Sequence, residues 1–172
     1  MEKGQERNRF YRVALLTLSD KGARGEREDV SGGVLREMIL SLSAKVVFQE
    51  ILPDEQPEIE AVLRRLSDSR EVDLILTTGG TGVSPRDVTP DATLRVLDRK
   101  LPGMAEAMRA ASLKKTPHAM ISRAVCGIRK ETLIVNLPGS PRGVRENLAV
   151  LLPALPHALD KIRGDEGECG GE

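Results

Sequence analysis

The sequence contains almost no aromatic residues. Phe, Tyr and Trp make up 2% of the 172 residues, with one Tyr, two Phe and no Trp. Proteins that bind single-stranded nucleic acid stack its bases on aromatic side chains, so this composition argues against that role. The 26 basic and 26 acidic side chains cancel to a formal net charge of zero, which gives a polyanion no overall charge to attract. No nucleic-acid partner is therefore expected.

Cysteine and long apolar runs are also scarce. Cys126 and Cys169 lie far apart, the second in a polar tail, so we expect no disulfide framework and a reducing compartment. Neither has a His or Cys neighbour at metal-ligand spacing. No apolar run approaches the length of a membrane span, and the first nine residues do not resemble a signal peptide. We expect a cytoplasmic protein that does not contact membranes.

The length of the chain fits one domain with a substantial core. We expect this domain at residues 10–163, with flexible tails at 1–9 and 164–172. Apolar runs at residues 10–19, 44–52 and 72–78 predict buried strands.

Helical periodicity separates these predicted strands. Helices are predicted from Ser31, as the capping residue, and from Pro57 in a first turn. The alternation of strands and helices predicts right-handed parallel crossovers and a sheet covered on both faces. The loop at residues 20–31 is predicted to be exposed.

The second half of the chain continues with shorter elements. Helices are predicted at residues 91–97 and 102–115, followed by a hairpin of strands at 120–127 and 131–137. A last apolar helical stripe from Val144 to Ile162 contains Pro153 and Pro156, which should kink or split it.

A glycine-rich turn follows the third predicted strand. Gly79, Gly80 and Gly82 let a ligand approach the backbone closely, and free amides in such a turn can hold phosphate. Asp87 follows within a few residues. Asp54 ends the second predicted strand and should approach the same place if that strand lies beside the third. Ligands usually bind at the carboxyl ends of strands in open α/β sheets.

A glycine turn alone is weakly specific. The sequence has neither a P-loop nor the third glycine of the dinucleotide fingerprint. A second predicted turn strengthens the signal, because Gly139 permits a tight turn, Ser140 can cap a helix and Pro141 suits its first position. Free amides there form a second candidate anion site.

Together these features indicate a site for a nucleotide with Mg²⁺. Magnesium prefers carboxylate and phosphate oxygens, and phosphoryl or nucleotidyl transfer needs mainly positioning and charge neutralisation. The arginines available to such a site are Arg86, Arg123 and Arg142. His118 and His157 have no evident partners for a nucleophilic triad and are interpreted as surface or packing residues.

Five ordered motifs then suggest a family. They are Thr77-Thr-Gly-Gly-Thr-Gly82, Arg86-Asp-Val-Thr-Pro90, Leu101-Pro-Gly-Met-Ala-Glu106, Ile121-Ser-Arg-Ala124 and Asn136-Leu-Pro-Gly-Ser-Pro141. Between about residues 13 and 162 the chain resembles the Mog/MoaB family of molybdenum-cofactor biosynthesis proteins.

The resemblance implies a fold and an activity. The fold is a three-layer α/β/α sandwich with a mostly parallel central sheet and a C-terminal hairpin, usually a homotrimer. The activity is that of a molybdopterin adenylyltransferase, in which the terminal phosphate of molybdopterin attacks the α-phosphate of Mg-ATP and pyrophosphate leaves. A molybdate-insertion protein of the MoeA type would then use the adenylylated product.

The resemblance also implies roles for individual residues. Asp54 and Asp87 match the two functional aspartates, expected to bind Mg²⁺ and align the reacting phosphates. Glu106 matches a family motif but can equally form contacts within its own helix. The residues expected to bind nucleotide or pterin are Asp20, Gly79, Gly80, Thr81, Gly82, Ser122, Arg123, Asn136, Gly139 and Ser140.

One alternative to the adenylyltransferase stays open, and a second is disfavoured. A MoaB-type relative would bind or carry molybdopterin without catalysis, although both aspartates are present in this chain. A CinA-type domain shares the glycine turn but acts on pyridine nucleotides. The Asn136-Leu-Pro-Gly-Ser-Pro141 match and the lack of a second domain argue against the CinA-type assignment.

Overall fold

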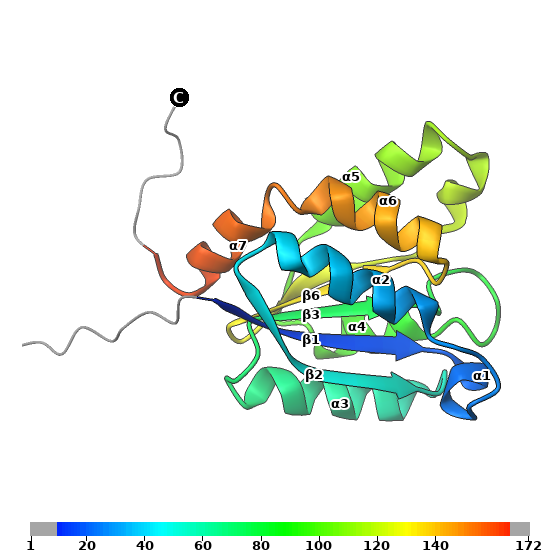
Figure 1. Ribbon diagram of the computed structural model, residues 1–172, viewed down its shortest axis with the longest axis horizontal. Coiled ribbons are helices and arrows are strands. Elements are labelled where there is room, and N and C mark those ends of the chain that lie inside the picture. The colour runs from blue at the N-terminus through cyan, green and yellow to red at the C-terminus, as the bar shows by residue number, and fades with distance from the viewer. Residues whose placement is uncertain (1–9, 166–172) are drawn as a thin grey trace, which may run out of the picture.

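A computed structural model describes residues 10–165 (Figure 1). Its six strands form one sheet in the order β2-β1-β3-β6-β5-β4. Strands β2, β1, β3 and β6 run parallel, whereas β5 and β4 are antiparallel to their neighbours. The strands are β1 (Tyr11–Leu18), β2 (Ala44–Leu52), β3 (Leu74–Thr78), β4 (Arg99–Lys100), β5 (Cys126–Arg129) and β6 (Thr132–Leu137).

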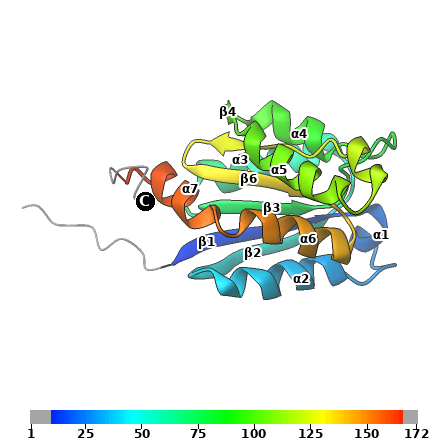
Figure 2. The same cartoon turned by 90° about the horizontal axis from the view of Figure 1, so that it is seen from above.

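Helices cover both faces of this sheet. In Figures 1 and 2, α2, α5, α6 and α7 lie on one face and α3 and α4 on the other. The predicted three-layer α/β/α fold with a mostly parallel sheet is confirmed. The helices are α1 (Asp20–Ala23), α2 (Val30–Met38), α3 (Gln56–Asp68), α4 (Thr89–Val96), α5 (Pro102–Leu113), α6 (Pro141–Leu151) and α7 (Leu155–Ile162), with 3₁₀ turns η1 (Ile39–Ser41) and η2 (Pro117–Ile121).

The core consists of two apolar clusters, one on each side of the sheet. Alternate residues of a strand point to opposite faces, so Val13 and Leu15 join the cluster under α2, α5, α6 and α7. Ala14 and Leu16 join the cluster under α3 and α4. This two-sided burial explains why the central strands read as continuous apolar runs.

Several element boundaries differ from the prediction. The strand predicted at residues 120–127 begins only at Cys126, because Pro117 opens η2 and Thr116 caps it through the His118 amide. Helix α2 is capped by Asp29, not by Ser31. The predicted loop at 20–31 contains the short helix α1. As predicted, the proline-containing segment after Leu151 splits the C-terminal helix into α6 and α7.

The strand order also corrects one assumption about the site. Asp54 was expected to approach Asp87 if β2 lay beside β3. Strand β1 instead lies between β2 and β3, so that assumption was wrong. Both residues nevertheless line one cleft, because the parallel strands β2, β1 and β3 all end at the same edge of the sheet.

The structure describes only part of the two predicted tails. The predicted tail at 1–9 lies outside the described residues, as do residues 166–172 of the tail predicted at 164–172, with Cys169 among them. Residue Gly164 donates its amide to Lys161 O at 3.1 Å and so continues the turn after α7. Cys126 is buried and free, and burial raises the pKa of its thiol to about 12.

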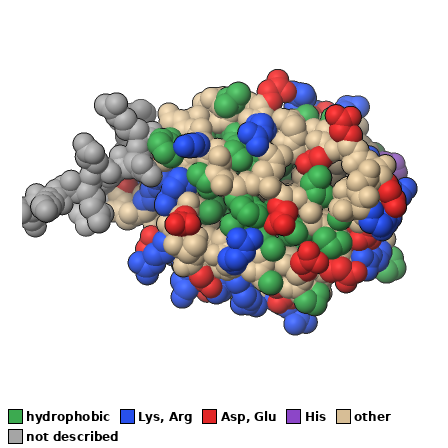
Figure 3. Space-filling view, turned by 60° about the horizontal axis from the view of Figure 1, so that its bottom comes forward, with side chains coloured by type: hydrophobic (Ala, Val, Ile, Leu, Met, Phe, Trp, Pro, Cys, Tyr) green, Lys and Arg blue, Asp and Glu red, His purple; other side chains and the backbone are tan. Residues whose placement is uncertain are grey.

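The charged side chains on the described surface reflect the balanced numbers of basic and acidic residues. On the face shown in Figure 3, basic and acidic side chains are interspersed. Within residues 10–165, no helix is both long enough and apolar enough to cross a membrane.

Ser67 on α3 has a buried hydroxyl. This residue is 1% exposed, and its hydroxyl has no hydrogen-bond partner among the described residues. An unsatisfied buried hydroxyl costs about 1 kcal/mol or more, so Ser67→Ala should raise the free energy of unfolding by about 1 kcal/mol. Urea denaturation measures this change, and the exposed Ser41→Ala is the control. A lower stability of Ser67→Ala would contradict the prediction.

Candidate functional site

The glycine turn after β3 has a backbone that only glycine adopts without strain. Gly79 has φ of 102° and Gly80 of 62°, where L residues are strained. A Cβ at Gly79 would lie 2.3 Å from Leu18 O, and one at Gly80 2.4 Å from Thr89 Oγ1. These glycines therefore let β1, β3 and α4 pack closely around the turn.

Two clefts open at the carboxyl ends of the parallel strands, one on each side of this turn. The smaller has a volume of about 390 Å³ and includes Gly79 and Gly80, and the larger has about 500 Å³ and includes Thr81 and Gly82. Ser140 lines both clefts. The turn is thus the wall between two adjoining cavities.

The smaller cleft contains the predicted carboxylates Asp54 and Asp87. The Asp54 carboxylate accepts the Asp20 amide at 3.0 Å through Oδ2, and the Asp20 carboxylate accepts the Asp54 amide at 3.0 Å. Arg86 donates to both Asp20 oxygens at 2.9 and 3.0 Å and to Glu55 at 2.8 Å. This network holds Asp54 beside the turn.

The two aspartates of the network differ in their electrostatics. Burial raises the pKa of Asp54, and the hydrogen bond from the Asp20 amide offsets this effect only in part. The hydrogen bond from Arg86 lowers the pKa of Asp20. Asp87 accepts the Ser84 amide at 2.9 Å through Oδ2.

Asp54 offers an oxygen that a hard cation could use. Its Oδ1 is buried without a hydrogen-bond partner among the described residues, next to the glycine turn. Residues 10–165 contain no group of three or more His, Cys, Asp or Glu that could hold a metal ion. Magnesium usually takes one or two carboxylates together with substrate phosphates and water, so this donor set fits a metal that arrives with a phosphate ligand.

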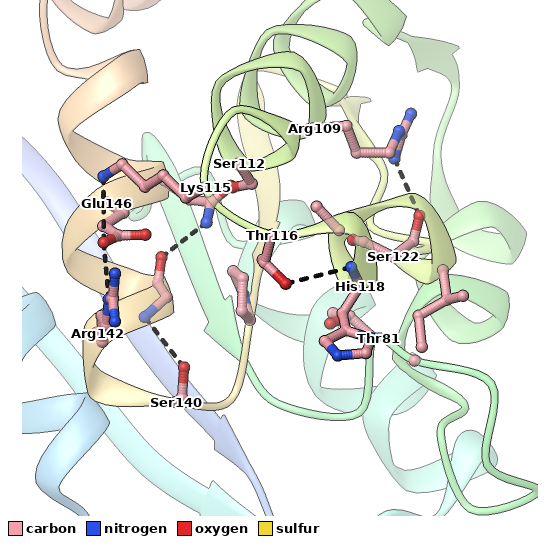
Figure 4. A pocket seen from close by; sticks show the side chains of 16 residues that line it. Thr81, Arg109, Ser112, Lys115, Thr116, His118, Ser122, Ser140, Arg142 and Glu146 are labelled. Atoms are coloured by element: carbon pink, nitrogen blue, oxygen red, sulfur yellow. Dashed lines mark hydrogen bonds and ion pairs between the residues drawn. The ribbon is translucent and has the colours of Figure 1, made fainter.

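The larger cleft lies between the end of α5, η2 and the start of α6 (Figure 4). Lys115 contacts Glu146 at 3.1 Å, and Arg142 contacts it at 2.9 Å. Two cations therefore share one carboxylate on this wall. Ser122 and His118 lie across the cleft from these cations (Figure 4), and the apolar Ile121 also lines it.

The second predicted turn lies between the clefts. Ser140 caps α6 by accepting the Gly143 amide at 3.0 Å, as predicted. Thr78 Oγ1 donates to Pro138 O at 2.6 Å, and Ser31 Oγ donates to Gly139 O at 2.7 Å. These bonds fix the loop against β3 and α2, and Gly139 lines the smaller cleft.

Three predicted binding residues, Asn136, Arg123 and Asp20, line neither cleft. Asn136 is fully buried and donates to Thr77 and Thr93, both at 3.0 Å. The guanidinium of Arg123 donates to Gly82 O at 2.8 Å, to Asp87 O and to Asp91. Both therefore support the walls of the site. Asp20 likewise lines neither cleft and acts through its bonds to Asp54.

The structure adds wall residues that sequence reasoning missed. They come from α5, η2 and α6, which are far from the glycine turn in sequence, and from the loop before α2. The Ser-Arg motif after η2 and Arg142 at the start of α6 pointed to this region, but not to these residues. The added residues are Arg109, Ser112, Lys115, Thr116, His118, Glu146 and Asn147 in the larger cleft and Arg27, Glu28 and Asp29 in the smaller.

A parallel α/β sheet with two glycine-containing turns at its carboxyl edge is typical of domains that bind phosphate-bearing ligands. The chain belongs to one particular family of this class. Residues 14–157 match the model of the family described as "Probable molybdopterin binding domain", which confirms the resemblance seen in the five motifs.

Relatives of known name cover most of the chain. A molybdopterin adenylyltransferase of Helicobacter pylori is 42% identical over 155 residues, 89% of this chain and 88% of the relative. One of Haemophilus influenzae is 45% identical over 169 residues, 90% and 86% of the two chains. The crystal structure of the molybdopterin biosynthesis enzyme MoaB from Thermus thermophilus is 52% identical with a TM-score of 0.86, covering 91% of this chain and 98% of that one.

Proposed function

We propose that this protein is a molybdopterin adenylyltransferase of molybdenum-cofactor biosynthesis. The terminal phosphate of molybdopterin attacks the α-phosphate of ATP, a new phosphorus–oxygen bond forms, and the bond to pyrophosphate breaks. The observation that carries this proposal is the pair of adjoining clefts, because two phosphate-bearing substrates can meet across the glycine turn. The names of the relatives support an adenylyltransferase.

Each cleft suits one substrate. The carboxylates of the smaller cleft would hold Mg²⁺ and with it the phosphates of ATP, and the magnesium would neutralise charge on those phosphates. Asp54 and Asp87 are the proposed ligands. The larger cleft combines Lys115 and Arg142 with apolar surface from Ile121 and Pro138, which suits a pterin with a terminal phosphate.

The wider setting follows from the family resemblance and is proposed with it. The protein would act as a cytoplasmic homotrimer and hand the adenylylated pterin to a MoeA-type insertion protein. Sedimentation at micromolar concentration tests the trimer, and a strict monomer would refute it.

The activity is tested by measuring pyrophosphate release from Mg-ATP with and without molybdopterin, while mass spectrometry follows the adenylylated pterin. Release that requires the pterin and equals the adduct formed is expected. If the pterin binds but no pyrophosphate forms with any nucleotide or divalent metal, the chain is a MoaB-type binding or carrier protein instead.

A further inference from the structure

Arg123 connects three parts of the wall between the clefts. Its amide donates to Thr81 O at 2.8 Å, and its Nε donates to Gly82 O at 2.8 Å. Its Nη2 donates to Asp87 O. The side chain thus bonds to backbone carbonyls at both ends of the segment from Gly82 to Asp87.

Asp91, in the first turn of α4, fixes the plane of this guanidinium. The two side chains form a two-pronged ion pair, with distances of 3.2 Å from Nη1 to Oδ1 and 3.0 Å from Nη2 to Oδ2. Such paired hydrogen bonds define the orientation of both groups. Because Nη2 bonds to both Asp91 and Asp87 O, the Asp91 carboxylate orients the guanidinium towards the turn.

Beyond Arg123 and the Arg86 network, few bonds link the backbone of this turn to the rest of the fold. Gly80 is tied to α4 through the Thr89 amide, at 3.2 Å. Further along, Ser84 and Asp87 bond mainly to each other, through Asp87 N to Ser84 O and Ser84 N to Asp87 Oδ2. Val83 is 64% exposed, so packing does not hold this part of the wall. Arg123 holds the backbone carbonyls at the two ends of the segment, whereas Arg86 ties it to Asp20 and Glu55 through its side chain.

We propose that Asp91 is a positioning residue for the reaction, which acts through Arg123 to fix the glycine turn and the Asp87 backbone between the two substrates. The inference rests on the proposed function. Asp91 lines neither cleft and does not bind substrate. Loss of the Asp91 carboxylate removes no group that lines either cleft, but it lets the glycine turn between them move. The alignment of the reacting phosphates is therefore impaired more than the affinity for either substrate.

The chain contains a matched control pair. Arg129 binds Asp68 in the same two-pronged way, at 3.0 and 2.8 Å, and also donates to Val96 O at 3.0 Å. The Asp68 side chain is 44% exposed, as is that of Asp91. Neither Asp68 nor Arg129 lines a cleft, so Asp68→Asn removes an equivalent ion pair away from the chemistry.

The test compares Asp91→Asn with Asp68→Asn in the full-length protein. Displacing reacting groups by about 1 Å can cost on the order of 100-fold in rate. For Asp91→Asn we therefore expect kcat to fall at least about tenfold, while KM for Mg-ATP and for molybdopterin each change less than about threefold. Asp68→Asn should keep wild-type kcat, and the two variants should have similar urea midpoints.

A second variant tests the same inference independently, in case Asp91→Asn does not fold. Arg123→Lys keeps the charge but loses the fork that reaches Gly82 and Asp87, and its kcat should fall at least as far as that of Asp91→Asn. If Asp91→Asn keeps kcat within about twofold of wild type, or if Asp68→Asn loses as much, the inference is wrong while the proposed function stands. A wild-type protein without pterin-dependent turnover refutes the proposed function itself.

Discussion

Asp54→Asn is expected to lower pterin-dependent pyrophosphate release at least about 100-fold, the scale seen when one electrostatic contact to a transition state is removed. The variant has nearly the same shape, and its side-chain oxygen can still accept the Asp20 amide. It loses the negative charge at Oδ1, the buried oxygen without a partner beside the glycine turn. A magnesium ion would then have one ligand fewer and would neutralise the phosphates less well.

Glu28→Gln is the matched control for this prediction. Glu28 lines the same cleft, is exposed and has no proposed role in the chemistry. Its loss should change turnover less than about threefold. Steady-state kinetics, together with calorimetric titration of ATP in the presence of magnesium, measure both variants. Turnover of Asp54→Asn above about a tenth of wild type would remove Asp54 from the catalytic machinery.

The layers of the fold could be predicted because the strands are buried on both faces. Leu74 and Leu76 enter one cluster and Ile75 the other, so the sequence reads as an unbroken apolar run. Met120 and Ile121 are apolar as well, yet they are 68% and 50% exposed in η2. Apolar character alone does not distinguish a strand from a surface turn that begins at a proline.

The site was predictable where backbone geometry dictates residue type. Gly79 and Gly80 have positive φ, and Ser140 caps a helix, so local sequence reveals both turns. Lys115 and His118 carry no such signal, because only the packing of α5 against α6 brings them to the cleft. Asn136 shows that a residue in a site motif need not line the site. It belongs to a motif at the site, but its amide bonds to Thr77 and Thr93 inside the core.

The largest effect on stability is expected at the opposite edge of the sheet, at Asp73. This residue is 4% exposed and accepts hydrogen bonds from Arg12 at 2.9 and 3.0 Å and from Arg163 at 2.7 and 3.2 Å. Burial alone would raise the pKa of its carboxyl, but the bonds from the two arginines outweigh burial and lower the pKa to about 2. The cluster joins β1, the start of β3 and the end of α7.

Asp73→Asn should lower the free energy of unfolding by about 2–3 kcal/mol at neutral pH, at or just below the lower end of the range of about 3–5 kcal/mol for breaking a buried ion pair. The arginines can recover some hydration, because the side chains of Arg12 and Arg163 are 28% and 25% exposed. Urea denaturation measures the loss. Asp68→Asn, which removes the exposed pair with Arg129, is the control and should shift the urea midpoint only slightly.

The pH dependence of this difference distinguishes the charge of Asp73 from its packing. The folded-state pKa of about 2 lies below the ordinary value of 3.8, so the stabilisation is fully present above the ordinary value and is lost as the pH falls through about 2. The stability gap between wild type and Asp73→Asn should therefore be constant from neutral pH to about 4.5 and should shrink steadily below about 4. A gap that stays constant down to pH of about 2 would mean that the ion pairs contribute little and that packing around Asp73 holds α7 to the sheet.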